Sequence, residues 1–280
     1  MSPSPVPTHR ITGAALLAGI AGQPVAHSLS PVIHNAWLEA GGIDGVYAPF
    51  APKDAAGFDS LVAAGRAGLV QGLNVTAPFK QQAFALADES SDAAKATGSA
   101  NILVFENGRV RADSSDGVGV LYALAEQAPG LNLKGAVVVM LGAGGAARAG
   151  AGVLIEAGAS IRILNRSRDR AEALAADLGP AVTVADEAAL ASADLVINAL
   201  SVQPSIDLSA LKPTSVVMDM TYKPVVTPFL AAARARGLTT VDGLAMLIGQ
   251  ATPSFIALFR RPPPPLDLRP LLLTHLGEAT

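Results

Sequence analysis

Residues 136–147 read Ala-Val-Val-Val-Met-Leu-Gly-Ala-Gly-Gly-Ala-Ala, an apolar run that ends in a glycine-rich turn. Its first six residues form a continuous apolar run, typical of a strand buried on both faces of a parallel sheet. The pattern then predicts a helix from the glycines to about Ala157. Glycines at such a turn let the backbone approach a pyrophosphate, which the N-terminus of the helix attracts. The stretch therefore predicts a dinucleotide-binding loop with candidate contacts Gly142, Ala143, Gly144, Gly145 and Ala146.

This motif departs from a strict G-x-G-x-x-G because its third small position is Ala147. The alternative is a glycine-rich turn that serves only the close packing of helix on strand. The context favours the dinucleotide loop, since a buried strand precedes the glycines and a second strand–helix unit follows them.

The residues after the next predicted strand, 160–164, indicate which dinucleotide binds. Residues 165–170 read Asn-Arg-Ser-Arg-Asp-Arg, with three arginines and no acid at the strand end. An acid there would hold a ribose 2′-hydroxyl and favour NAD, whereas arginine pairs well with a 2′-phosphate. The sequence therefore favours NADP, with candidate contacts Asn165, Arg166, Ser167 and Arg170. The alternative is a solvated helix start whose arginines pair with Asp169 or Glu172.

The alternation of short apolar runs and helical patterns continues on both sides of this centre. Towards the C-terminus, strands are predicted at 182–184, 194–199, 215–220 and 239–241, and a long apolar helix at 245–259. Towards the N-terminus, strands at 16–22, 46–50 and 70–75, helices at 30–40 and 56–67, and an Asn-Gly hairpin at 106–108 form a separate unit. We therefore expect an α/β protein whose second unit has parallel strands joined by right-handed crossovers.

The composition limits the classes of function. The chain has 280 residues, of which 50% are hydrophobic and 15% charged, and its formal net charge is −3. This balance gives no basic surface for nucleic acid or an anionic membrane. The sequence contains no uncharged run of 18 apolar residues, so no membrane-spanning helix is predicted. The absence of cysteine excludes disulfides, thiolate metal sites and cysteine nucleophiles. We expect a cytoplasmic protein with no bound metal.

Polar side chains gather at strand ends in the first unit. Ser28 and Ser30 precede a predicted helix and suit a carboxylate, although Ser30 could serve only as the helix N-cap. Asn74 and Thr76 alternate onto one face of an extended segment, and Lys80 follows one short turn later. A lone lysine could equally be a surface residue. In the same way, Asp116 could be only the N-cap of a helix.

These motifs together resemble the shikimate dehydrogenase family. The stretch 22–35, Gly-Gln-Pro-Val-Ala-His-Ser-Leu-Ser-Pro-Val-Ile-His-Asn, is similar to the opening motif of that family. The Asn-Val-Thr-x-Pro-x-Lys run at 74–80 resembles its catalytic-lysine motif, and the glycine loop, Asn-Arg-Ser at 165–167 and the run 242–251 follow in order. The resemblance covers residues 16–260.

The resemblance implies roles for individual residues. Lys80 and Asp116 would be the catalytic pair, and Ser28 and Ser30 would hold the substrate carboxylate. The remaining substrate contacts would be Asn74, Thr76, Asn101 and Gln250 at the ring hydroxyls and Tyr222 near the substrate. Gly243 and Met246 would add to the cofactor site.

The resemblance also implies the reaction and the domain organisation. Family members reduce 3-dehydroshikimate to shikimate with NADPH in aromatic amino-acid biosynthesis. The fold would be α/β with two domains: an N-terminal α/β substrate domain (1–116 plus 243–280) and a Rossmann-type NADP-binding domain (117–242). The C-terminal helix would return to the first domain. The protein would bind only small molecules and be a monomer or homodimer.

Some positions depart from the family pattern. Ile102 stands where the family has Thr, and Ser114 and Ser115 stand where it usually has Asn-Thr before the aspartate. Leu200 replaces the threonine of an Asn-Ala-Thr motif. These differences bear on rate and selectivity. The catalytic residues are retained.

Three alternatives remain at this point. They are a quinate/shikimate dehydrogenase that uses NAD, a non-catalytic nucleotide sensor, and a methylene-tetrahydrofolate-type dehydrogenase. The arginine cluster argues against the first, the Lys80–Asp116 pair against the second, and the Ser-Leu-Ser anchor against the third. His27, His34 and Trp37 are assigned no catalytic role. We expect His34 and Trp37 to pack and to form local hydrogen bonds.

Overall fold

Two separate six-stranded sheets organise the chain, and the computed structural model describes residues 11–278. The first compact unit comprises the chain up to Ser115 together with the part from Ala251 onward, and the second comprises Asp116–Gln250. The second boundary falls inside the long helix α9 (Gly243–Phe259), which therefore begins in one unit and ends in the other. The predicted C-terminal return to the first unit occurs within this helix.

The first unit is built on a mixed sheet of order β2-β1-β3-β5-β6-β4. Its elements are β1 (Leu16–Ala21), α1 (Ser30–Ala40), β2 (Gly45–Phe50), α2 (Ala55–Arg66), β3 (Gly72–Val75), α3 (Lys80–Ala85), β4 (Glu89–Ser90), α4 (Asp92–Thr97), β5 (Ile102–Glu106), β6 (Arg109–Asp113) and α10 (Leu268–Leu276). Strands β1, β2 and β3 are parallel, and β5 runs antiparallel to both β3 and β6. The predicted hairpin joins β5 to β6, where Asn107 and Gly108 have φ of 52° and 76°.

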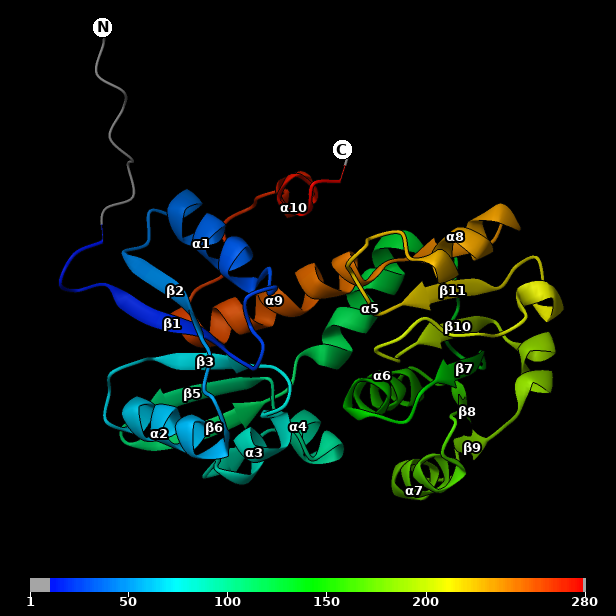
Figure 1. Ribbon diagram of the computed structural model, residues 1–280, viewed down its shortest axis with the longest axis horizontal. Coiled ribbons are helices and arrows are strands. Elements are labelled where there is room, and N and C mark those ends of the chain that lie inside the picture. Colours follow the sequence, from blue (N-terminus) through cyan, green and yellow to red (C-terminus); the bar gives the residue numbers. More distant parts are fainter. Residues whose placement is uncertain (1–10, 279–280) are drawn as a thin grey trace, which may run out of the picture. The chain divides into compact units, whose positions relative to one another are not determined.

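The second unit contains a wholly parallel sheet of order β12-β11-β10-β7-β8-β9 (Figure 1). Its elements are α5 (Asp116–Gln127), β7 (Val137–Leu141), α6 (Gly145–Glu156), β8 (Ser160–Leu164), α7 (Arg168–Leu178), β9 (Val182–Val184), the 3₁₀ helix η1 (Glu187–Ser192), β10 (Leu195–Asn198), the 3₁₀ helix η2 (Leu208–Ala210), β11 (Val216–Asp219), α8 (Pro228–Ala235) and β12 (Thr239–Val241). Counted from β7, this is the 3-2-1-4-5-6 order of dinucleotide-binding sheets, which confirms the predicted Rossmann-type unit.

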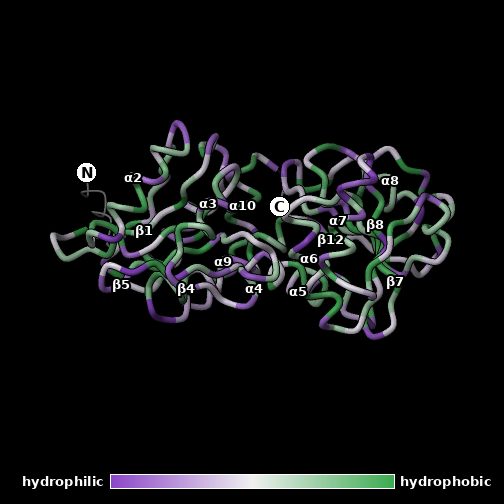
Figure 2. Tube along the Cα trace, turned by 90° about the horizontal axis from the view of Figure 1, so that it is seen from below, coloured by the Kyte–Doolittle hydropathy of each residue, from purple (hydrophilic) through white to green (hydrophobic). Residues whose placement is uncertain are grey.

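Alternate residues of the central strands enter two different cores. Val138 and Met140 pack with α5, α6 and α7 on one face of the sheet, and Val139 and Leu141 pack with η1, η2 and α8 on the other. Because both faces are covered, the strand is apolar at every position, as its sequence predicts. Figure 2 shows the corresponding green, hydrophobic stretches along the strands near β8.

Candidate functional site

The glycine loop lies at the switch point of the second sheet, between β7 and β10, where ligands of such sheets bind. Gly142 follows β7 with φ of 111°, and a Cβ there would lie 3.0 Å from Leu200 Cδ2. At Gly144 and Gly145 an added Cβ would meet no atom of the described residues within 4 Å. Packing therefore explains the first glycine only. The open backbone at the other two, where α6 begins without a side-chain cap, fits the approach of a pyrophosphate.

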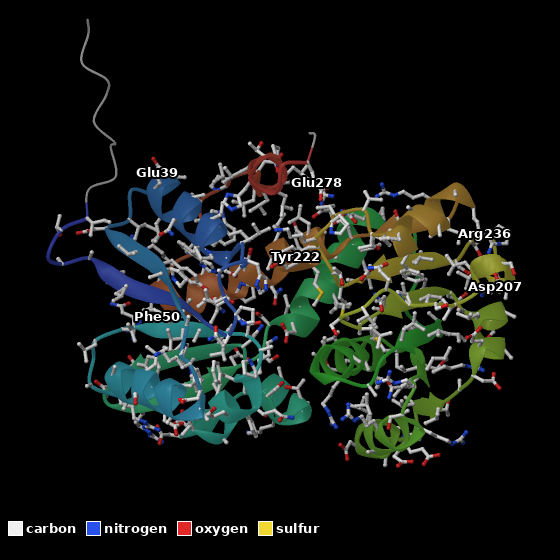
Figure 3. The ribbon with its side chains drawn as sticks, in the orientation of Figure 1. Glu39, Phe50, Asp207, Tyr222, Arg236 and Glu278 are labelled. Carbon is white, nitrogen blue, oxygen red and sulfur yellow. The ribbon has the colours of Figure 1, made fainter. Side chains whose placement is uncertain are left out.

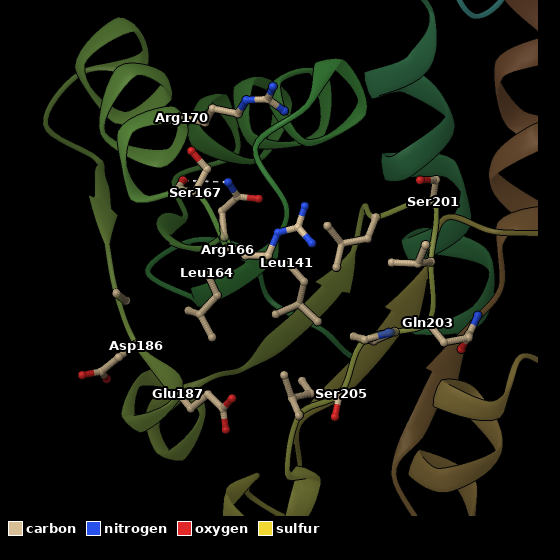
Figure 4. Close-up of a pocket in the computed structure, with 16 residues that line it drawn as sticks. Leu141, Leu164, Arg166, Ser167, Arg170, Asp186, Glu187, Ser201, Gln203 and Ser205 are labelled. Atoms are coloured by element: carbon tan, nitrogen blue, oxygen red, sulfur yellow. Dashed lines mark hydrogen bonds between the residues drawn. The ribbon is translucent and has the colours of Figure 1, made fainter.

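A pocket of about 870 Å³ opens beside this switch point, at the ends of β7 and β8. Its lining includes Asn165, Arg166, Ser167 and Arg170, so the structure brings four predicted cofactor residues together. Figure 4 shows the two arginines on one side of the pocket and the loop carrying Ser201, Gln203 and Ser205 on another. The loop 165–167 is held by a hydrogen bond from Asn165 Nδ2 to the Ser167 carbonyl, at 2.8 Å.

The arginines of this loop differ in their partners. Arg168 Nε donates to Glu172 Oε1 at 2.8 Å, as the solvated-helix alternative requires. No ion pair within residues 11–278 includes Arg166 or Arg170, and both are exposed at the pocket. Two guanidinium groups without an acidic partner in this part of the chain are suited to an incoming phosphate.

The pocket also contains acidic residues that the sequence analysis did not single out. Asp186 and Glu187 follow β9 and lie across the pocket from the arginines (Figure 4). Asp186 caps η1 by accepting a hydrogen bond from Ala188 N at 3.0 Å. Their position directly after the third strand of a βαβαβ unit could have predicted this, because the carboxyl ends of such strands all line the same crevice.

A buried carboxylate supports the loop between β10 and η2. Asp219, at the end of β11, accepts hydrogen bonds from Asn198 Nδ2 at 3.0 Å, Thr221 N at 3.0 Å and Thr227 Oγ1 at 2.7 Å. Asn198 Oδ1 in turn accepts one from Leu200 N at 3.2 Å. These bonds fix the backbone of Leu200, just after β10, and of Thr221, just before Tyr222. Tyr222 is labelled in Figure 3.

In the first unit, Asn74 and Asn101 are buried and hydrogen-bonded to each other. Asn74 Nδ2 donates to the Asn101 carbonyl at 3.0 Å and to Ser254 Oγ at 2.8 Å, and Asn74 Oδ1 accepts from the Tyr47 hydroxyl at 2.8 Å. Asn101 Oδ1 accepts from Ser115 N at 2.9 Å. The sequence analysis missed Tyr47 and Ser254, which carry no motif signal and meet Asn74 only through the fold.

The structure corrects the N-cap alternative for Ser30. Helix α1 begins at Ser30 itself, and the capping position is Leu29, whose φ and ψ of −85° and −8° are already helical. Ser28 Oγ accepts a hydrogen bond from Ser30 N at 3.2 Å, and the Ser30 hydroxyl bonds to Tyr47. Both serines therefore lie together at the start of α1, and capping does not account for Ser30.

Lys80 and Thr76 lie at the two ends of the turn between β3 and α3. Thr76 packs against Gly22, where an added Cβ would be 2.3 Å from Thr76 Cγ2. Lys80 opens α3, and its carbonyl accepts a hydrogen bond from Ala100 N at 2.9 Å. This bond brings the backbone of Lys80 next to that of Asn101.

The other predicted residues belong to the second unit. Asp116 is buried and opens α5, directly after Ser115. Gly243 and Met246 lie in the first turns of α9, and Gln250 is the last residue of the unit. None of these four is among the residues that line the 870 Å³ pocket.

His34 packs as predicted. Its ring stacks on Tyr47 with centroids 4.1 Å apart and meets Trp37 edge-on at 5.8 Å. The expected hydrogen bonding fails at one atom, because His34 Nδ1 is buried without a partner among the described residues. Burial lowers the pKa of His34 to about 3, so the ring is neutral.

No helix within residues 11–278 has the length and apolar character needed to cross a membrane.

Comparisons with known proteins match both units. Residues 20–103 match the family model of the shikimate dehydrogenase substrate binding domain, and residues 123–244 match that of shikimate / quinate 5-dehydrogenase. A shikimate dehydrogenase (NADP(+)) of Caulobacter vibrioides is 50% identical, over 97% of this chain and 99% of the relative.

Solved structures give the same family. Shikimate 5-dehydrogenase of Thermus thermophilus, in complex with NADP(H) and shikimate, has a TM-score of 0.81 at 34% identity, over 89% of this chain and 95% of that one. Quinate dehydrogenase of Corynebacterium glutamicum, in complex with NAD, has a TM-score of 0.84 at 30% identity, over 94% of this chain and 99% of that one.

Proposed function

We propose that this chain, which belongs to the shikimate dehydrogenase family, catalyses the reversible, NADP-dependent reduction of 3-dehydroshikimate to shikimate. It is an oxidoreductase of aromatic amino-acid biosynthesis. The observation that carries the cofactor assignment is the pair of guanidinium groups of Arg166 and Arg170 at the pocket beside the glycine loop, neither of them in an ion pair within residues 11–278. The open backbone at Gly144 and Gly145 fits the pyrophosphate of the same cofactor.

Polar side chains hold the substrate at several points. Ser28 and Ser30 bind its carboxylate at the start of α1, and Asn74, Thr76, Asn101 and Gln250 bind its ring hydroxyls, with Tyr222 near the ring. The buried hydrogen bonds of Asn74 and Asn101 support this assignment, because a fixed amide discriminates between donor and acceptor groups. Anchoring the ring at several points places one carbonyl for reaction.

Lys80 and Asp116 carry the proton chemistry. The bound cofactor supplies the hydride to the carbonyl carbon. The Lys80 ammonium polarises the carbonyl, stabilises the negative charge that develops on its oxygen, and donates the proton. The Asp116 carboxylate orients that ammonium. In the reverse direction the same lysine accepts the proton.

We place the protein in the cytoplasm as a monomer or homodimer. By the ligands that they would bind, we assign residues 1–116 plus 243–280 to a substrate domain and 117–242 to an NADP domain, although Asp116 and residues 243–250 belong to the second compact unit. The ligands of the protein are small molecules. The runner-up activity is an NAD-dependent quinate/shikimate dehydrogenase, which the likeness to the Corynebacterium quinate dehydrogenase favours.

Initial rates of cofactor reduction test both activities, with shikimate or quinate crossed with NADP⁺ or NAD⁺. We expect the shikimate and NADP⁺ combination to exceed the others by at least about tenfold in kcat/KM, the scale of one charged hydrogen bond. Quinate with NAD⁺ as the best pair would replace the proposal by the runner-up. Turnover with no pair would indicate the nucleotide sensor.

A further inference from the structure

Tyr47 is a fully buried residue of β2 that the reaction itself does not use. The residue is 1% exposed, its ring is stacked on His34, and its backbone is fixed by Asn35, whose side chain donates to Tyr47 O at 2.9 Å and accepts from Tyr47 N at 3.0 Å. The hydroxyl therefore occupies one position. That position is between Asn74 and Ser30, with which it forms hydrogen bonds.

The direction of these hydrogen bonds follows from a carbonyl. Asn74 Nδ2 must be the atom facing the Asn101 carbonyl, because a carbonyl only accepts. Asn74 Oδ1 then faces Tyr47, whose hydroxyl donates its single hydrogen bond to that oxygen. Towards Ser30 the phenol oxygen can only accept, so the Ser30 hydroxyl is the donor. Burial raises the pKa of Tyr47 well above its usual value, which keeps this proton in place.

The second end of the Asn74 amide is held by Ser254, from the part of α9 that belongs to the first unit. The distance from Asn74 Nδ2 to Ser254 Oγ is 2.8 Å, and Ser254 is buried. A flip of the amide would place its NH₂ group against the Tyr47 hydroxyl and its oxygen against the Asn101 carbonyl. Two oxygens would then face each other without a proton between them.

We propose that Tyr47 and Ser254 are positioning residues that fix the carboxamide of Asn74 in one orientation and tie it to Ser30. This inference rests on the proposed function, in which Asn74 meets a ring hydroxyl and Ser30 the carboxylate. The Tyr47 hydroxyl thus links the groups that hold two different parts of the substrate. Its loss leaves Asn74 Oδ1 and the Ser30 hydroxyl without their common partner, and the apparent affinity falls with the fraction of molecules in which both side chains stay in place.

The test is Tyr47→Phe, which removes one hydroxyl and keeps the stacked ring. We expect the KM and the calorimetric Kd for shikimate to rise about tenfold, the scale of one buried hydrogen bond, with kcat and the KM for NADP⁺ within about twofold. Tyr122→Phe removes the hydroxyl of an exposed tyrosine of α5; it is the control and should leave the KM and Kd for shikimate within about twofold. Ser254→Ala should raise the shikimate KM about threefold, since Asn74 Nδ2 keeps its bond to Asn101.

A double-mutant cycle separates positioning from general damage. Because the link to Ser30 remains in Asn74→Ala, adding Tyr47→Phe to that variant should weaken shikimate binding by about threefold at most, clearly less than the tenfold loss expected alone. A full tenfold loss in that background, or an unchanged shikimate Kd in Tyr47→Phe alone, would overturn the proposal. Should Tyr47→Phe fail to fold, an unchanged KM in Ser254→Ala overturns it instead. A wild-type protein that binds shikimate without turnover overturns only the proposed function, and one that does not bind it overturns both.

Discussion

Arg166→Ala should raise the KM for NADP⁺ far more than the KM for NAD⁺. The Arg166 guanidinium is exposed at the 870 Å³ pocket and has no ion pair within residues 11–278, so its removal breaks no contact that stabilises the fold. We expect the melting temperature to stay within about 1 °C, as for surface substitutions in general. The whole effect should appear in cofactor binding.

The magnitude follows from the charge and exposure of the group. A hydrogen bond to a charged group contributes about 1.5–3 kcal/mol, which is about 10- to 150-fold in affinity. Solvent screens an exposed guanidinium, so the lower end applies and the KM for NADP⁺ should rise about tenfold at low salt. NAD⁺ has no 2′-phosphate, and its KM should change by less than about twofold. The difference should shrink as the ionic strength increases.

Arg168→Ala is the matched control for this measurement. It removes the same side chain two residues along the chain, but Arg168 is paired with Glu172 and does not line the pocket. We expect its KM for both cofactors to change by less than about twofold. Initial rates with each cofactor at saturating shikimate give all of these values. An equal rise for NADP⁺ and NAD⁺ in Arg166→Ala would refute the reasoning, because the arginine would then not recognise the 2′-phosphate.

Three further changes test other parts of the molecule. Lys80→Ala should lower kcat by about 100-fold or more and leave the Kd for NADPH unchanged; near-normal turnover would remove Lys80 from the mechanism. Gly142→Ala should reduce the free energy of unfolding by about 1–2 kcal/mol in urea titrations, because φ of 111° disfavours a side chain and Leu200 lies 3.0 Å from the new Cβ; an unchanged midpoint would contradict this. The pKa of His34 is lowered from 6.5 to about 3, so the unfolded chain takes up this proton first and stability falls as the pH drops below about 6.5. From pH 7 to pH 5 this loss should be about 2 kcal/mol and absent in His34→Phe, and equal losses in both proteins would exclude His34 as the cause.

The second unit could be predicted closely from its sequence. Strands 160–164, 182–184 and 239–241 have the predicted bounds. The reason is that a parallel sheet covered on both faces needs continuous apolar strands, and these contrast sharply with the amphipathic helices between them. Strand β4 was missed because two residues are too few to show a period.

The start of α1 was less predictable. A serine before a proline is a common N-cap signal, but Ser30 lies inside the helix and its hydroxyl is bonded to Tyr47. When a hydroxyl can bond either to the nearby backbone or to a distant side chain, the sequence around it does not show which partner it takes. The arginines at 166 and 168 show the opposite case, because Arg168 has Glu172 four residues further along the helix, whereas the residue four positions after Arg166 is Arg170.

The α/β class, the predicted dinucleotide loop, the preference for NADP and the residues of the family motifs could all be predicted without a structure, because each depends on residue types at short, fixed spacings. The tertiary structure alone decided which polar groups meet. Tyr47, Asn74, Asn101 and Ser254 come from distant segments, and 180 residues separate Asn74 from Ser254. Their hydrogen bonds exist because strands β2, β3 and β5 and helix α9 pack together, and no local pattern encodes such a meeting.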